Sequence, residues 1–134
     1  MQYRRFGRTE LQMPVFSCGG MRYQQSWKDI PAADITIDNQ ENLEATIRRS
    51  LAVGIDHIET ARGYGTSEMQ LGRVLSKLPR DRFIIQTKVS PKADPLEFRR
   101  NFEQSFKNLN LESIDLLGIH GINTPETLEW AIRP

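Results

Sequence analysis

Residues 54–68 read GIDHIETARGYGTSE, and their pattern indicates the fold class most clearly. The first part of this stretch, residues 55–59, is a short expected strand, and a loop with two glycines follows it. Ser67 then opens a pattern of apolar residues at i, i+3, i+4 and i+7, which is the spacing of one helix face. These residues are Leu71, Val74, Leu75 and Leu78. The stretch therefore predicts a strand, a tight loop and a helix, which is one βα unit.

Three further strands are expected on either side of this unit. They are residues 15–18, 83–88 and 114–120. The first of them ends in Gly19-Gly20, which indicates a tight loop at its carboxyl end. At the N-terminus, residues 2–6 and 11–13 are expected to form a β-hairpin with Gly7 in its turn.

Helices are expected between the strands, and residues 22–37 are expected to be a long loop. The first helix is expected to begin at the capping-box residues 38–41 and the second at Ser67. The third is expected to begin at the N-cap Asp94 and the fourth at Thr124. Pro95 suits the first helical position after Asp94, Glu97 suits the returning partner of a capping box, and Asn110 suits the end of that helix. Its expected buried stripe is Phe98, Phe102, Phe106 and Leu109.

Strand and helix alternate strictly along the chain, which predicts an α/β fold with parallel strands and right-handed crossovers. A (β/α)8 barrel typically needs about 250 residues and would reach its fourth helix near residue 134. We therefore expect the N-terminal half of a TIM barrel, with about four βα units and an N-terminal β-hairpin.

The composition excludes several classes of function. The 134 residues carry 18 Lys and Arg against 17 Asp and Glu, so the net charge of +1 gives no basic footprint for nucleic acid. No apolar run is long enough for a membrane span. The single cysteine, Cys18, cannot form an internal disulfide, which favours a cytoplasmic protein with a buried thiol. His57 has no Cys or second His at ligand spacing, so no metal site is expected.

Polar residues follow three successive expected strands, where parallel α/β proteins carry their chemistry. Glu59, Lys88 and His120 hold these positions, and Tyr64 lies in the loop after Glu59. A nearby ammonium lowers the pKa of a phenol from about 10, so Lys88 would make Tyr64 a usable general acid. Glu59 would hold Lys88 charged, and His120 could orient a carbonyl oxygen or relay a proton. Since no side chain supplies a hydride, this hypothesis for carbonyl chemistry requires a nicotinamide cofactor.

The motifs of residues 54–68, 86–89 and 114–120, with the hairpin at Gly7-Arg8-Thr9, resemble the aldo-keto reductase family. The resemblance covers essentially the whole chain. It implies a (β/α)8 barrel, NADP(H) as the cofactor and the reversible reduction of aldehydes and ketones. Residues 1–134 would then be one reductase-like domain that stops after the fourth strand.

The resemblance also assigns site residues. The family's tetrad of Asp, Tyr, Lys and His falls on Glu59, Tyr64, Lys88 and His120, and the backbone of Gly19, Gly20 and Met21 would approach the nicotinamide. Glu59 departs from the family's aspartate by one methylene, so its contact with Lys88 must form through a different rotamer.

Other functions stay open. Phosphate is frequently held after strands seven and eight of such barrels, so catalysis is expected to be incomplete in this chain. A non-catalytic barrel fragment or binding subunit is the alternative, and a lyase with Lys88 as a Schiff-base nucleophile is a third hypothesis. The open barrel edges favour self-association. Tyr23 and Trp27 either line a substrate loop or cover the barrel rim.

Overall fold

The fold is described by a computed structural model over residues 1–132, so the expected end of the fourth helix at Pro134 lies outside the described residues. A parallel sheet has the strand order β3-β4-β5-β6. Its strands are β3 (Cys18–Gly19), β4 (His57–Glu59), β5 (Ile84–Val89) and β6 (Leu116–Ile119). The expected hairpin is confirmed, with β1 (Tyr3–Arg5) antiparallel to β2 (Gln12–Pro14).

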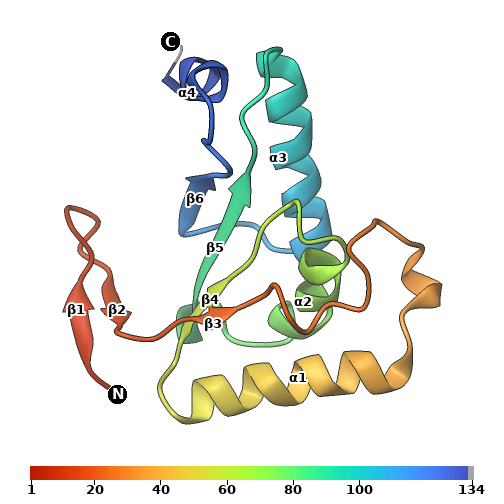
Figure 1. Ribbon diagram of the computed structural model, residues 1–134. Coiled ribbons are helices and arrows are strands. Elements are labelled where there is room, and N and C mark those ends of the chain that lie inside the picture. Colours follow the sequence, from red (N-terminus) through yellow and green to blue (C-terminus); the bar gives the residue numbers. More distant parts are fainter. Residues whose placement is uncertain (133–134) are drawn as a thin grey trace.

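Helices alternate with the parallel strands, as the sequence predicts. They are α1 (Ile37–Ala52), α2 (Ser67–Leu75), α3 (Pro95–Leu109) and α4 (Pro125–Ile132), with short 3-10 turns η1 (Ala32–Asp34) and η2 (Arg80–Arg82). In Figure 1, α1, α2 and α3 lie on one side of the parallel sheet, and the hairpin lies on the other side. Within residues 1–132, no helix is long and apolar enough to cross a membrane.

The start of α1 differs from the expected capping box at residues 38–41. The Thr36 hydroxyl accepts a hydrogen bond from the Asn39 backbone N–H at 3.4 Å, so Thr36 is the N-cap. The prediction was wrong by two residues because an earlier hydroxyl satisfies the first free amides of the helix. The segment 22–37, expected to be loop throughout, also holds the turn η1.

The ends of α3 match the prediction, whereas its buried stripe does not. The Asp94 carboxylate accepts from the Leu96 backbone N–H at 2.9 Å, and Asn110 ends the helix in the left-handed region with φ 52°. Of the four expected stripe residues only Leu109 is fully buried, and the three phenylalanines are half-buried. Leu109 lies where α3 meets Gly72 of α2, which explains its burial.

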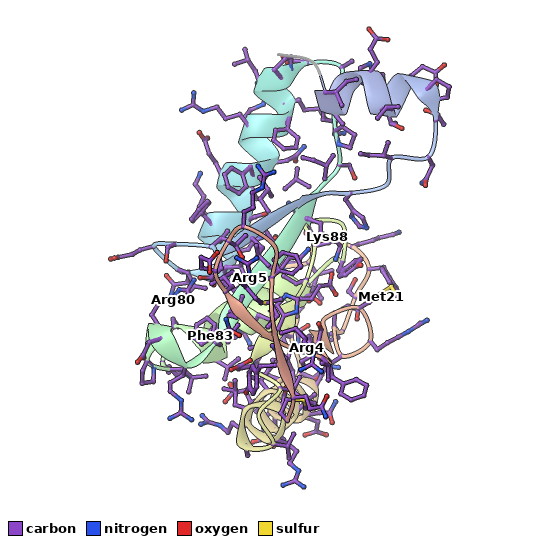
Figure 2. The ribbon with its side chains drawn as sticks, turned by 90° about the vertical axis from the view of Figure 1, so that its left-hand side faces the viewer. Arg4, Arg5, Met21, Arg80, Phe83 and Lys88 are labelled. Carbon is purple, nitrogen blue, oxygen red and sulfur yellow. The ribbon has the colours of Figure 1, made fainter. Side chains whose placement is uncertain are left out.

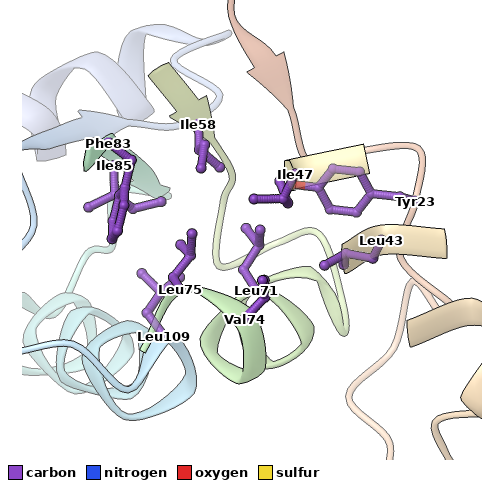
Figure 3. Packing of buried hydrophobic residues seen from close by; sticks show 10 residues of the cluster. All are labelled: Tyr23, Leu43, Ile47, Ile58, Leu71, Val74, Leu75, Phe83, Ile85 and Leu109. Carbon is purple, nitrogen blue, oxygen red and sulfur yellow. The ribbon is translucent and has the colours of Figure 1, made fainter. Parts of the chain in front are cut away.

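The hydrophobic core fills the space between the sheet and the helices (Figure 3). Its buried members are Tyr23, Leu43, Ile47, Ile58, Leu71, Val74, Leu75, Phe83, Ile85 and Leu109. Successive residues of a strand point to opposite faces, so Ile58 and Ile85 face the helices and their neighbours face away. Glu59 is therefore directed to the face opposite the core, as is Lys88, which is an odd number of residues from Ile85.

Gly72 lets α2 approach α3 closely, and this contact gives a stability prediction. A Cβ at Gly72 would lie 2.2 Å from the Asn108 carbonyl oxygen, which is backbone and cannot turn away. We expect Gly72→Ala to lower the free energy of unfolding by about 1–3 kcal/mol, because overpacking outweighs the gain of about 1 kcal/mol in helix propensity. Urea denaturation followed by circular dichroism measures the change.

Gly63→Ala is the matched control, because its Cβ would meet no atom closer than His120 Nδ1 at 3.8 Å. Its unfolding midpoint should stay near that of the parent chain. A Gly72→Ala chain as stable as the parent would show that α2 and α3 can separate at no cost.

Candidate active site

The ends of three parallel strands bring the predicted site residues to one face of the sheet. Glu59 ends β4, Lys88 lies near the end of β5, and His120 follows β6. The register pairs Lys88 with Gly118, and the His120 backbone N–H donates to the Val89 carbonyl oxygen at 2.9 Å. Figure 2, turned to show the hairpin side of the molecule, labels Lys88 on this face. Strand pairing thus gathers groups that are distant in sequence.

Lys88 is the centre of the group. Its ammonium forms an ion pair with the Glu59 carboxylate and donates a hydrogen bond to the Thr60 carbonyl oxygen at 3.0 Å. The Lys88 Nζ also lies 4.7 Å from the centroid of the Tyr64 ring, over its face. The side chains of Lys88 and Glu59 are only 17% and 22% exposed. The Glu59 side chain, which is one methylene longer than that of an aspartate, thus forms the ion pair with Lys88.

Two opposing effects act on the Lys88 ammonium. Burial lowers the pKa of Lys88 to about 8, because the charged form loses water. The adjoining Glu59 carboxylate favours the charged form in return. The amine consequently loses its proton closer to neutral pH than an ordinary lysine does.

Tyr64 lies between two other rings at the same face. Its centroid is 5.5 Å from that of His120 and 6.2 Å from that of Trp27, and both pairs meet edge to face. Burial, and then the positive charge of Lys88, lower the pKa of His120. His120 is therefore a neutral imidazole at neutral pH, able to donate or accept one hydrogen bond beside Tyr64.

The glycines after β3 differ in their surroundings. The Gly20 backbone N–H donates to the Glu59 carbonyl oxygen at 2.7 Å, and a Cβ there would lie 2.8 Å from that oxygen. Gly20 thus serves the packing of the β3 loop against β4. Gly19 is exposed, and the atom nearest to a Cβ placed there would be Glu59 Oε2, at 3.6 Å. Met21 is half-buried. The open backbone beside the site is therefore that of Gly19.

One ion pair at this face was not predicted from the sequence. Arg62 donates a bidentate pair of hydrogen bonds to the Asp29 carboxylate. These hydrogen bonds hold the pKa of that carboxyl below its usual value. The pair connects the loop before α1 to the loop after β4, and a cavity of about 260 Å³ lies beside it, lined in part by Trp27 and Ser90. Since the partners are 33 residues apart in two loops, no spacing in the sequence signals them.

Cys18, His57 and Tyr23 take structural positions. Cys18 packs against the core, and burial raises the pKa of its thiol. His57 is buried, and its Nδ1 lies 2.7 Å from the Ser17 hydroxyl oxygen. Tyr23 belongs to the core, whereas Trp27 is 57% exposed and contacts Tyr64. Among residues 1–132, no group of three or more potential metal ligands is found.

Comparison with known proteins identifies the relatives of this chain. The model of the Aldo/keto reductase family matches residues 16–132. L-glyceraldehyde 3-phosphate reductase of Escherichia coli K12 is 28% identical over 143 residues, which cover 93% of this chain and 38% of that protein. NADH-specific methylglyoxal reductase of the same organism is 37% identical over 89 residues, which cover 63% of this chain and 27% of that protein.

A solved structure extends the likeness to the fold. The thermostable aldo-keto reductase Tm1743, in complex with the inhibitor epalrestat, superposes with a TM-score of 0.77 at 25% identity. The match covers 98% of this chain and 48% of Tm1743, so the chain spans about half of that structure. This likeness confirms the predicted half barrel.

Proposed function

Because the chain belongs to the aldo/keto reductase family, we propose that it carries the proton-transfer residues of a nicotinamide-dependent reduction of aldehydes and ketones. The observation that carries the proposal is the position of Lys88, paired with Glu59 and lying over the Tyr64 ring at the carboxyl ends of the strands. As the chain spans only part of its relatives, this activity is that of a completed barrel.

Each residue has a distinct role in this proposal. The Tyr64 phenol donates a proton to the carbonyl oxygen, and the nearby Lys88 ammonium stabilises the negative charge left on the phenol. Glu59 holds Lys88 in place through the ion pair. His120, neutral beside the ring, donates a hydrogen bond that orients the carbonyl oxygen.

The cofactor we propose is NADP(H), which supplies a hydride to the carbonyl carbon when it is bound. The open backbone of Gly19, next to the Glu59 carboxylate, leaves room for a flat ring, and Met21 flanks it. Gly20 would act indirectly, by holding this loop against β4. One relative is named for NADH, so both cofactors belong in the assay.

The substrate class we propose is small carbonyl compounds. The names of two relatives specify a glyceraldehyde phosphate and methylglyoxal, both small carbonyl compounds. We assign residues 1–134 to one reductase-like domain and propose a cytoplasmic location, in keeping with a lone cysteine at position 18.

A chimeric barrel tests the proposal. In it, this chain is followed by the part of Tm1743 that the structural match does not cover. We expect oxidation of NADPH or NADH when methylglyoxal or a simple aldehyde is added, measured by absorbance. Circular dichroism first establishes that the chimera is folded.

A non-catalytic barrel fragment or binding subunit is the second candidate, favoured by Glu59, which stands where the family's tetrad has an aspartate. It predicts a folded chimera that shows no turnover with either cofactor. That result would contradict the proposed reductase function.

Self-association is expected from the open edges of the sheet. Among residues 1–132, β3 and β6 each pair on one side only, and large apolar residues near them are exposed. These residues are Val15, Phe16, Leu117, Ile119 and Ile122. Because unpaired edges and apolar patches promote association, we expect a dimer or larger assembly by light scattering. A stable monomer at all concentrations would contradict this expectation.

A further inference from the structure

Lys88 has the surroundings of a reactive amine as well as those of a positioning cation. The charged and titratable groups that face it come from three directions: Glu59 and His57 from β4, Tyr64 from the loop after β4, and His120 after β6. Strand alternation directs the Lys88 side chain to the face of the sheet opposite the core. Figure 1 shows α1, α2 and α3 on the other face. A small molecule can therefore approach this face without displacing a helix.

We propose that Lys88 of this chain captures small aldehydes covalently, as a reversible imine, without any cofactor. This activity goes beyond the proposed reduction, in which Lys88 forms no bond to the substrate. The same pocket of proton donors serves both reactions, because each begins with a carbonyl oxygen that must be protonated.

The reaction balances with the groups present. The neutral Lys88 Nζ adds its electron pair to the aldehyde carbon, and the carbonyl oxygen takes a proton to become a carbinolamine hydroxyl. Tyr64 or His120, both next to Lys88, can donate that proton. The nitrogen first loses one proton through Glu59 to solvent, which leaves a neutral carbinolamine. The hydroxyl then takes a second proton from Tyr64 or His120 and leaves as water, and the nitrogen loses its last proton by the same route. The product is an imine and one water molecule.

The other lysines lack this environment. Lys92 forms an ion pair as well, with Glu97 at 2.8 Å, but its side chain is 36% exposed and no proton-donating ring contact accompanies it in the described part of the chain. Burial lowers the pKa of Lys88 to about 8, while an unperturbed lysine has a pKa of about 10.4. At pH 7 a larger fraction of Lys88 than of a surface lysine is therefore neutral.

The test is reductive alkylation of the folded chain at pH 7 with propionaldehyde and cyanoborohydride, which reduces an imine to a stable secondary amine. Peptide mass spectrometry then gives the rate at each of the five lysines, Lys28, Lys77, Lys88, Lys92 and Lys107. We expect Lys88 to react at least about tenfold faster than Lys92, the ion-paired reference. A larger neutral fraction and the adjoining Tyr64 and His120 proton donors should outweigh the slower approach of the aldehyde to a less exposed side chain.

Lys88→Arg and Lys92→Arg are the matched variants. Lys88→Arg should remove the fast phase of labelling, and Lys92→Arg should leave it intact. In the urea-unfolded chain, Lys88 and Lys92 should react at similar rates. Equal rates in the folded parent chain, or a difference that persists in urea, would overturn the proposal.

This outcome is separable from that of the proposed function. The labelling needs neither nicotinamide nor the rest of a barrel, so an inactive chimera leaves the labelling result intact. Conversely, an active chimera with an unreactive Lys88 would support the reductase and refute aldehyde capture.

Discussion

Replacing Tyr64 with Phe in the chimeric barrel should lower kcat for aldehyde reduction by about 10²- to 10⁴-fold, the usual contribution of a positioned general acid. The substitution removes only the hydroxyl, so the ring keeps its edge contacts with Trp27 and His120 and the fold is preserved. Steady-state kinetics with a saturating cofactor measures the change. Near-normal kcat in Tyr64→Phe would remove Tyr64 from the mechanism.

Glu59 provides the comparison. We expect Glu59→Ala to lower kcat less than Tyr64→Phe, because the carboxylate acts only by holding Lys88. If Glu59 takes the place of the family's aspartate, as we propose, Glu59→Asp should preserve or raise activity. A Glu59→Ala loss larger than that of Tyr64→Phe would instead make the carboxylate a direct participant.

Residues 1–134 alone should bind NADPH no more tightly than about 1 mM and show no measurable turnover. In eight-stranded barrels the phosphate site lies mostly after strands seven and eight, whereas the described sheet has four parallel strands. Each charge-assisted hydrogen bond to phosphate contributes about 1.5–3 kcal/mol, so the lack of several weakens binding by orders of magnitude. Calorimetric or fluorescence titration with NADPH measures the dissociation constant.

The chimeric barrel is the control for this titration. It should bind NADPH at least about 100-fold more tightly, because the added strands bring their phosphate-binding loops. A micromolar dissociation constant for the isolated chain would show that its own loops hold the cofactor. In that case the view that catalysis is incomplete in this chain would be wrong.

The pattern of apolar residues was enough to predict the parallel α/β architecture. Period-four spacing marked the helices, short apolar runs marked β4, β5 and β6, and Asp94-Pro95 marked the start of α3. These features are local, since they depend on residues within one or two turns of each other. The strand expected at residues 15–18 was wrong, because Val15 and Phe16 are exposed and β3 begins only at Cys18. Glu59, Lys88 and His120 were also predictable as a group, because parallel strands place their carboxyl ends at one edge of the sheet.

Other features depend on contacts between segments that are distant in sequence, so local patterns could not predict them. Loop packing placed the Tyr64 ring face against the Lys88 Nζ and paired Arg62 with Asp29. Gly72 of α2 lies close to the Asn108 carbonyl oxygen of α3, and the phenylalanine stripe of α3 is half-buried. Burial is a property of what covers a residue, and the covering segment lies tens of residues away, beyond the reach of any local pattern.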